Sequence, residues 1–529
     1  MLQHLEHQLV FDYFRAKGLI PDVENRFGCQ AEAAALVAAI LKFRDTVNAD
    51  ERFVRYKVLV GFESVYPEHW TDQEFDYTGA EEYRQREADR YIEELTEANE
   101  NDCLDLTLRC AETKSDDLAT FPPFGNFLSK LAERKPDIAA RFLAKASDKL
   151  RNFLAGFLNG LSLSDRRDIY ERILESELNS ARNLAGVARH LRYSTVTNPA
   201  FAARLLQRAM DQGEALAVIE CLLFAMEHYE TERITDPDAF LRDALTFLND
   251  RKDPRWVSEA WFLQKATKFY EAMTPDRTAQ ILQNLGYLRE VNYRTERILL
   301  RLAERQPEAV WDYFGARLAR ETAEGEEDQR FEAVPFRFNG LEKELSRDPR
   351  LAIRKGLSWF ARDQKLFQFR GGRLLSSAFP DCTPPFAAAL AELVKTGGEA
   401  EADFALSILQ NYRGETATHV VLKEVVSRFA DDARKMTRVR VSIDATGLVS
   451  GDLGFVVAWR AKKESLTDWL SDDRPAVKAF AERHIAELDV MIAAEQRRAE
   501  TERDMRNRSF DEEDADADDG GADAEPPAP

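Results

Sequence analysis

The stretch FLSKLAERKPDIAARFLAKA at residues 127–146 contains the pattern that decides the fold. Phe127, Leu128 and Leu131 recur at three- and four-residue spacing, which predicts an amphipathic helix. Pro136 predicts the start of a second helix, because a proline in the first helical turn lacks only an N–H that would have no partner inside the helix. Apolar residues then continue at helical spacing to Phe142. The hexamer LAERKP is therefore predicted to be a helix end, a tight corner and a helix start.

The same design returns along the chain. The hexamer LAERQP at 302–307 repeats it almost letter for letter, and other corners place a capping side chain directly before a proline. These corners are Asn198-Pro199, Asp236-Pro237, Asp253-Pro254, Thr274-Pro275 and Asp348-Pro349. Prolines at 384 and 475 start two further helices, whereas the only candidate strand, RVRVSID at 438–444, could as well end a helix. The sequence predicts short helices whose core comes from stacking on their neighbours.

One segment resembles a known repeat family. WLSDDRPAVKAFAERHI at 469–485 resembles the second helix of a HEAT repeat, in which an acid-rich turn precedes a Val-Lys/Arg-x-x-Ala stripe. Val477, Lys478 and Ala481 match that stripe, and the segment from Asp253 to Val257 matches it more loosely. The resemblance implies an all-α fold, an α-solenoid of HEAT-like antiparallel helix pairs. A globular helical bundle is the competing interpretation.

Composition shifts divide the chain into four predicted regions. Residues 1–120 form an N-terminal helical region, 121–435 the HEAT-like array, and 436–508 a C-terminal repeat with a long terminal helix. The acidic block within 71–117 is expected to be a solvated helix with Tyr83, Tyr91 and Ile92 facing the core. Residues 509–529 are predicted to be a disordered acidic tail, because nothing after Phe510 can form a core.

Charge and cysteine content exclude several classes of protein. The 529 residues carry a formal net charge of −21, which argues against a general binder of nucleic acid or of a membrane surface. The five cysteines are scattered and never spaced as CxxC, so neither a disulfide framework nor a zinc site is expected. The first residues lack the apolar run of a signal peptide, and no stretch approaches the roughly 20 apolar residues of a membrane span. We expect a soluble cytoplasmic protein without a membrane partner.

Motifs that would support catalysis are missing from the sequence. There is no GxxxxGK[ST] loop, and the glycine-punctuated stretch ATGLVSGDLGF at 445–455 has neither a lysine nor the G-x-S-x-G order. The seven histidines show no HExxH spacing, and His484 on an apolar stripe is expected to be a core side chain. The sequence therefore predicts no enzyme activity, no catalytic residue, no metal and no cofactor.

A basic and aromatic segment stands out against this acidic background. RLAIRKGLSWFARDQKLFQFRGGR at 350–373 holds one acid, Asp363, and seven basic residues. The candidate binding residues are Arg350, Arg354, Lys355, Arg362, Lys365, Arg370 and Arg373. Further basic residues follow at Arg434, Lys435, Arg438, Arg440, Arg460, Lys462 and Lys463, and they would extend the site if the array brought both groups to one face.

Two interpretations of this segment remain open. Its interleaved aromatic residues (Trp359, Phe360, Phe367 and Phe369) could be core, with the basic residues forming an ordinary solvated face. Alternatively, the segment binds phosphates, bases or an acidic peptide. Under the second interpretation, Arg370 and Arg373 flank Gly371-Gly372 at an exposed corner.

These observations predict a non-enzymatic binding or scaffold protein that holds a protein or peptide partner on a solenoid surface. The alternative is a nucleic-acid or phosphate-ligand sensor that uses 350–373. HEAT-like arrays also occur as the sensor portions of bacterial defence and signalling ATPases. Because this sequence contains no nucleotide-binding module, such a role would need a separately encoded ATPase as partner.

Overall fold

The computed structural model describes residues 1–18, 30–61, 66–71, 74, 76–115, 120–195, 198–260, 266–320, 331–447, 449–451 and 453–519, without the side chains of 30, 366, 369 and 506–519. Every regular element in these ranges is a helix and none is a strand. The predicted all-α fold class is therefore confirmed. The candidate strand at 438–444 is the second half of helix α26 (Ala433–Asp444).

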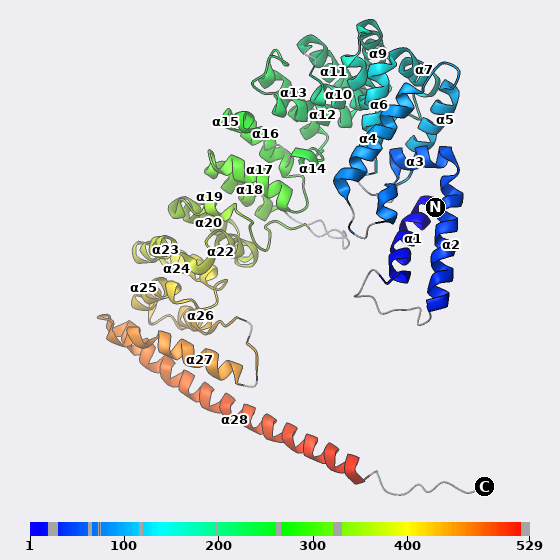
Figure 1. Cartoon of the computed structure of the whole chain (residues 1–529). Coiled ribbons are helices and arrows are strands. Elements are labelled where there is room, and N and C mark those ends of the chain that lie inside the picture. The colour runs from blue at the N-terminus through cyan, green and yellow to red at the C-terminus, as the bar shows by residue number, and fades with distance from the viewer. Residues whose placement is uncertain are drawn as a thin grey trace, which may run out of the picture. The chain divides into compact units, whose positions relative to one another are not determined.

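Contacts divide the chain into two compact units, Met1–Glu271 and Ala272–Pro529 (Figure 1). The four regions predicted from composition remain a prediction. Among the described residues, no helix is both long enough and apolar enough to cross a membrane.

The first unit is a succession of helices in which alternate members pack side by side. Helix α6 packs on α8, α8 on α10 and α10 on α12, while α7 contacts α9. The elements of this unit are α1 (Leu2–Ala16), α2 (Gln30–Asn48), α3 (Glu51–Val60), η2 (Pro67–Trp70), α4 (Tyr77–Glu93), α5 (Glu100–Ala111), α6 (Pro122–Arg134), α7 (Pro136–Ala146), η3 (Arg151–Phe153), α8 (Leu154–Leu163), α9 (Arg167–Ser180), α10 (Leu184–Tyr193), α11 (Pro199–Gln212), α12 (Ala215–Glu227), α13 (Pro237–Asp250), α14 (Val257–Ala260) and α15 (Thr267–Glu271).

The second unit repeats this packing. Helix α18 packs on α20, α20 on α23, α23 on α25 and α25 on α28, and α27 also lies against α28. The elements are α16 (Pro275–Leu285), α17 (Tyr293–Ala303), α18 (Pro307–Ala319), α19 (Glu342–Leu345), α20 (Pro349–Arg362), α21 (Gln364–Leu366), the π-helix η4 (Phe367–Gly371), α22 (Gly372–Ala378), η5 (Pro380–Cys382), α23 (Pro384–Thr396), α24 (Glu399–Leu409), η6 (Thr416–Thr418), α25 (His419–Phe429), α26, α27 (Gly454–Ser465), η7 (Thr467–Ser471) and α28 (Pro475–Asp519).

The predicted corners are confirmed at nearly every position. The prolines at 136, 199, 237, 275, 307, 349, 384 and 475 are each the first residue of a helix. The side chains of Asn198, Asp236, Thr274 and Asp348 each accept the backbone N–H three residues on, as an N-cap does. The corner at Asp253-Pro254 differs, because α14 begins only at Val257. Asp253 accepts a hydrogen bond from the Arg255 backbone N–H instead.

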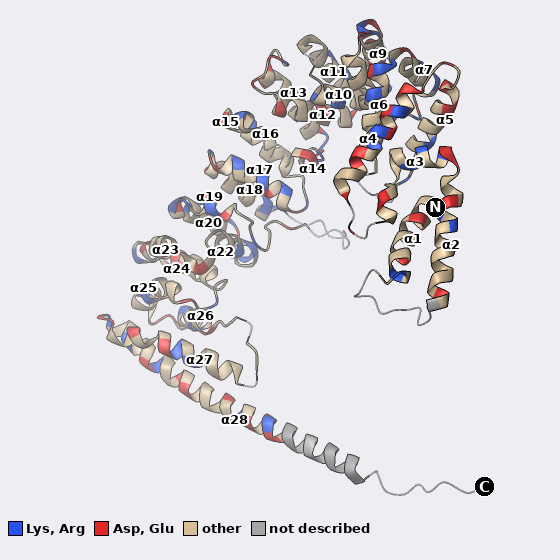
Figure 2. Cartoon of the chain, viewed as in Figure 1, with Lys and Arg blue, Asp and Glu red and all other residues tan. Residues whose placement is uncertain are grey.

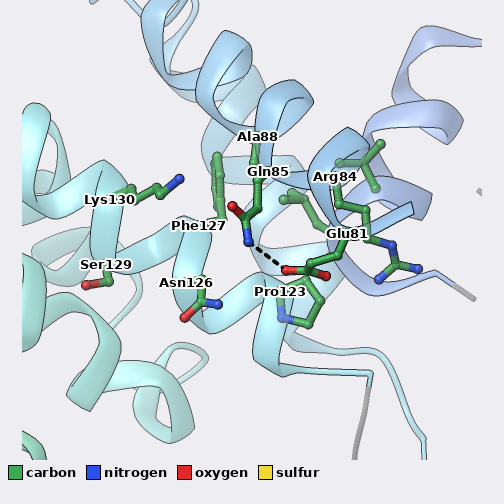
Figure 3. A pocket seen from close by; sticks show the side chains of 11 residues that line it. Glu81, Arg84, Gln85, Ala88, Pro123, Asn126, Phe127, Ser129 and Lys130 are labelled. Atoms are coloured by element: carbon green, nitrogen blue, oxygen red, sulfur yellow. Dashed lines mark hydrogen bonds between the residues drawn. The ribbon is translucent and has the colours of Figure 1, made fainter. Parts of the chain in front are cut away.

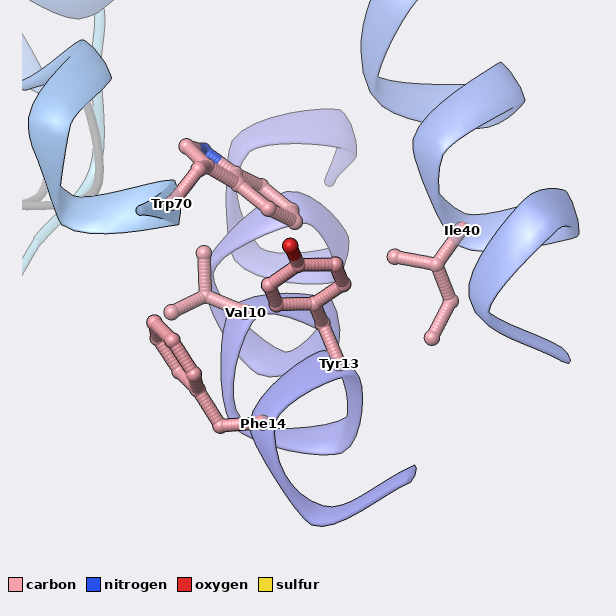
Figure 4. Close-up of a cluster of buried hydrophobic side chains, with 5 residues drawn as sticks. All are labelled: Val10, Tyr13, Phe14, Ile40 and Trp70. Carbon is pink, nitrogen blue, oxygen red and sulfur yellow. The ribbon is translucent and has the colours of Figure 1, made fainter. Parts of the chain in front are cut away.

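Apolar stripes of these helices form the core. Phe127, Leu131 and Phe142 from the first hexamer region are buried, as are Leu302 and Phe314 from the second. A separate cluster lies at the N-terminal end of the first unit (Figure 4). There α1 contributes apolar and aromatic side chains that pack against α2 and η2. Its members are Val10, Tyr13, Phe14, Ile40 and Trp70.

The acidic block near the N-terminus forms helices α4 and α5 over 77–93 and 100–111. In α4, Tyr91 and Ile92 are buried as predicted and Tyr83 is half-buried. At the other end of the chain, the backbone of α28 continues through Asp519, past the predicted start of a disordered tail at 509. Extending an existing helix fixes fewer dihedral angles per hydrogen bond than starting one, so an acidic sequence can continue a helix that it would not nucleate. Residues 520–529 lie outside the described residues.

Candidate functional site

The aromatic half of segment 350–373 lies mainly in the core. Phe360 and Phe367 are buried, and their rings contact each other and the ring of Phe404 on α24. Trp359 is half-buried, with its ring centroid 6.2 Å from that of Trp311 on α18. The side chain of Phe369 lies outside the described residues. These rings therefore fix α20 and η4 against their neighbours, and the basic side chains project from a rigid support.

The exposed corner predicted at Gly371-Gly372 is wrong. Gly371 ends η4 and Gly372 begins α22, so the backbone runs on in helical form and both glycines are buried. A Cβ on Gly372 would lie 2.6 Å from Nδ2 of Asn411 and 2.7 Å from the carbonyl oxygen of Ser407. The glycine therefore lets α22 approach α24 closely, a role that depends on residues far away in the sequence.

Two of the seven candidate basic residues already contact acids. The Nζ atom of Lys355 lies 2.9 Å from Oε1 of Glu308 and 2.7 Å from Oδ1 of Asp312, both on α18. The guanidinium of Arg373 lies 3.5 Å from Oε1 of Glu332. These two side chains are partly neutralised and are less available to an anionic ligand.

The other five candidates have no such partner. Within the part of the chain that the structure describes, their side chains make no ion pair or hydrogen bond. They are Arg350, Arg354, Arg362, Lys365 and Arg370. The first four are exposed and Arg370 is half-buried. Among these five residues, Arg354 acts on an acid at longer range. The pKa of Glu308 is lowered mainly by the hydrogen bond and charge of Lys355, and the charge of Arg354 adds to this effect.

The downstream basic residues behave differently. Lys435 pairs with Asp432, Arg438 with Asp403, and Arg440 and Lys463 with acids of α28. Lys462 donates to the backbone carbonyl oxygens of Arg413 and Gly414, and Arg460 to Gln496. Most of this second group is therefore engaged within the fold. Figure 2 shows the basic residues of α20 to α22 in blue with few acids on the same elements.

The five cations are spread along α20, α21 and η4. Arg350 and Arg354 lie one turn apart near the start of α20, whereas Arg362 is the last residue of α20 and Lys365 lies on α21. An α-helix rises roughly 1.5 Å per residue, so Arg350 and Arg362 are about 18 Å apart along the axis. Such a spacing suits an extended anionic chain better than a single phosphate group.

An aromatic residue that the sequence did not single out lies beside this surface. Phe336 is 82% exposed, and the guanidinium of Arg373 lies 5.1 Å from its ring centroid. The backbone around Phe336 is held on both sides: Arg317 donates to the carbonyl oxygen of Ala333 at 3.0 Å, and Glu296 accepts from the backbone N–H of Asn339. No periodic pattern marks this loop, and only its tertiary contacts show that it presents an aromatic ring to solvent.

We define the basic surface as Arg350, Arg354, Arg362, Lys365 and Arg370 together with Arg373 and Phe336. An exposed aromatic ring next to guanidinium groups can pack against a ligand while the cations pair with its anions.

A cavity of about 200 Å³ in the first unit has fewer polar side chains available to a ligand than the basic surface (Figure 3). It lies between α3, α4 and α6, over buried Val58, Leu59 and Phe127. Its polar side chains are largely engaged within the fold. Gln85 donates to Glu81, Lys130 donates to Asp89, and Arg84 donates to the carbonyl oxygen of Gly61.

Three of the four described cysteines are buried, and Cys103 is half-buried. Among the described residues, no group of three or more His, Cys, Asp or Glu side chains could hold a metal ion. The four described cysteines are free thiols. Burial raises the pKa of Cys382 to about 12, so this thiol is protonated at neutral pH.

Comparisons with protein families, curated proteins and solved structures find no match to this chain. Fold and geometry therefore define the molecule: an all-α protein with exposed basic side chains on α20 and α21.

Proposed function

We propose that this protein is a non-enzymatic binding protein that holds an acidic segment of a protein partner across the basic surface. One observation carries the proposal: five of the cations on α20 to η4 lack an acidic partner among the described residues, although the chain has a net charge of −21. In such an acidic chain, cations without internal partners are the groups that remain free to pair with a ligand. The elongated spacing of these cations favours an extended peptide.

We further propose that the helices form a HEAT-like α-solenoid. The support is the packing of alternate helices in each unit, α6 on α8 on α10 in the first and α20 on α23 on α25 in the second. Arrays of this kind provide extended surfaces for partners.

A nucleic-acid or phosphate ligand is the second candidate. The observation in its favour is the exposed ring of Phe336 beside Arg373, because bases stack on aromatic rings while cations contact the phosphates. Against it stands the net charge of the chain, which repels a polyanion as long as a nucleic acid more than it repels one short acidic segment.

The test compares two fluorescent probes, a labelled poly-glutamate peptide and a labelled single-stranded oligonucleotide, by anisotropy across a salt titration. We expect the peptide to bind at low salt. We also expect the Arg362→Glu/Lys365→Glu variant to weaken its binding by about tenfold or more, equal to about 1.4 kcal/mol. The matched control is Arg172→Glu/Arg242→Glu, which changes the net charge equally at two exposed arginines of the first unit.

The outcomes separate the candidates. Tighter binding of the oligonucleotide, with a steep loss of affinity as salt rises, would establish the phosphate ligand instead. If neither probe binds at low salt, or if the control variant loses as much affinity as the test variant, the basic surface is not the binding site.

A further inference from the structure

A second cavity lies in the first unit, between two inter-helix corners. Its volume is about 360 Å³, and it is lined by residues from the corner between α7 and α8 and from the corner between α9 and α10. Asn183 joins the two corners: its Nδ2 donates to the carbonyl oxygen of Arg151 at 2.6 Å, and its Oδ1 accepts from the Gly186 N–H at 3.2 Å. Ala181 takes a left-handed conformation, with φ of 54°, to make the second corner. The cavity is therefore part of a fixed backbone frame.

Charged groups of both signs line this cavity without contacting each other. The side chains of Ser147, Asp148, Arg151, Glu177 and Arg182 make no hydrogen bond or ion pair with any residue that the structure describes. Elsewhere in the same unit, arginines of neighbouring helices do pair with acids, as Arg204 does with Glu175 at 2.7 Å. Asp148, Arg151 and Arg182 are exposed at this cavity and Glu177 is half-buried, so charges of both signs face a ligand that carries both.

Of the four charged side chains at this cavity, only that of Glu177 is partly withdrawn from water. It is half-buried, and burial raises its pKa while the charge of Arg182 acts in the opposite direction. A carboxylate that loses water without gaining a donor costs free energy. A cationic group placed in the cavity would remove this cost.

The remaining lining is aliphatic. Leu143, Leu150 and Leu154 are buried and form an apolar wall of the cavity. A water molecule occupies about 30 Å³ in the liquid, so the cavity has room for about a dozen waters. This size suits a single small molecule with a short aliphatic part.

We propose that this cavity binds a small zwitterion of the amino-acid class with an aliphatic side chain. The ammonium group of the ligand pairs with Glu177 and Asp148, and its carboxylate pairs with Arg151 and Arg182. The aliphatic part packs on the three leucines. The site lies in the first unit and is independent of the function proposed for the basic surface.

The test is isothermal titration of the full chain with three probes: L-leucine, N-acetyl-L-leucine, which has no ammonium group, and L-leucinamide, which has no carboxylate. We expect leucine to bind and each blocked analogue to bind about tenfold or more weakly, because each leaves one set of charges in the cavity without a partner.

Two variants assign the charges. Glu177→Gln should weaken leucine binding and abolish the preference for leucine over N-acetyl-leucine, whereas Arg182→Gln should abolish the preference over leucinamide. The matched control is Arg172→Gln, at an exposed position of α9 that does not line the cavity. Melting temperatures of all variants show that the fold is intact.

Three results would overturn the proposal. The first is no measurable heat with leucine at millimolar concentration. The second is equal binding of all three probes, which would describe an apolar cavity without charge recognition. The third is an unchanged preference in both Glu177→Gln and Arg182→Gln.

Discussion

The ammonium group of Lys57 on α3 lies 2.7 Å from Oε2 and 2.9 Å from Oε1 of Glu6 on α1, with both side chains buried. Asn48 completes the site, since its Oδ1 accepts from the same ammonium group at 2.5 Å. Burial lowers the pKa of Lys57, and the charge and hydrogen bond of Glu6 act against that shift. The pair thus connects α1 to α3 through charges that are almost fully buried.

Removing one partner of this pair should destabilise the first unit strongly. Glu6→Ala leaves the Lys57 ammonium buried without a counter-charge, and we expect a loss of about 3–5 kcal/mol in the free energy of unfolding, measured by urea denaturation. The double variant Glu6→Leu/Lys57→Met should recover most of this loss, because an apolar pair of similar size removes both desolvated charges. Equal stability of Glu6→Ala and the wild type would show that water reaches the pair.

His190 makes a second buried polar contact, with an expected pH dependence of its own. Its Nδ1 lies 2.5 Å from Oδ1 of Asn159, which can only accept, so Nδ1 carries the hydrogen and Nε2 accepts from the hydroxyl of Tyr170 at 2.8 Å. A further proton would go to Nε2, which could then no longer accept from Tyr170, and burial lowers the pKa of His190 to about 3.

Acidification should therefore weaken the fold at His190. Between pH 6.5 and about 3 the unfolded chain binds a proton at this ring and the folded chain does not, which costs about 1.4 kcal/mol per pH unit. At pH 5 the loss is about 2 kcal/mol relative to pH 7. We expect His190→Gln to be less stable than the wild type at pH 7 but to show a shallower decline between pH 6.5 and 5 in thermal unfolding. Parallel declines would contradict the assignment.

His484 should respond to pH in the opposite direction. Its Nε2 lies 2.9 Å from Oδ1 of Asp444 on α26, and its Nδ1 lies 3.3 Å from Oε2 of Glu487 on α28. Burial alone would lower the pKa of His484, but the hydrogen bonds and charges of Asp444 and Glu487 outweigh it and the pKa is raised. When His484 is protonated, its two ring N–H groups donate to both carboxylates and join α26 to α28.

For a raised pKa, the added stability is complete below the unfolded value of about 6.5 and is lost as pH rises through the folded value. Asp444→Asn should reduce the pKa of His484 and remove most of this pH dependence, while Glu482→Gln, at an exposed position of the same helix, should leave it unchanged. An NMR titration of the imidazole protons measures the pKa directly. A His484 pKa below 6.5 in the wild type would contradict the prediction.

The close approach of α22 and α24 can be tested with glycine substitutions. Gly372→Ala places a methyl group against Ser407 and Asn411 and should cost about 1–3 kcal/mol. Gly125→Ala is the matched control, because a Cβ on this residue of α6 meets no atom within 4 Å. This control should be neutral or should stabilise the protein by up to about 1 kcal/mol. Equal effects of the two substitutions in chemical denaturation would show that α22 and α24 are not tightly packed.

The sequence predicted those features that depend on neighbours in the chain. Proline corners and their caps are local, since Asp348 and Pro349 act on the first turn of the helix that they begin. The role of Gly372 was missed because it is set by Ser407 on α24 and by Asn411, which follows that helix. The exposure of Phe336 depends in the same way on contacts made by Arg317 and Asn339. Distant packing, which periodicity does not encode, decided each of these cases.

Segment 350–373 was predicted only as a set of seven basic residues with two open interpretations. The structure divides these residues into two that pair with acids and five that, among the described residues, do not, because the acids come from other parts of the fold. Acids of α18 engage Lys355, and Glu332 engages Arg373, whereas the exposed side chains of Arg350, Arg354 and Arg362 on α20 make no ion pair among the described residues. No pattern in the sequence indicates which acids will lie within reach of which cation.

A comparison within α20 and α21 separates a binding role of these cations from a structural one. Arg362 and Lys365 are exposed and unpaired within the described residues, so Arg362→Glu/Lys365→Glu should change the free energy of unfolding by less than about 1 kcal/mol. Phe360 lies two residues before Arg362 but is buried against Phe367 and Phe404, and Phe360→Ala should cost about 3–5 kcal/mol. If the charge-reversed variant instead melts as early as Phe360→Ala, these cations stabilise the fold, and the partner of this protein must bind elsewhere.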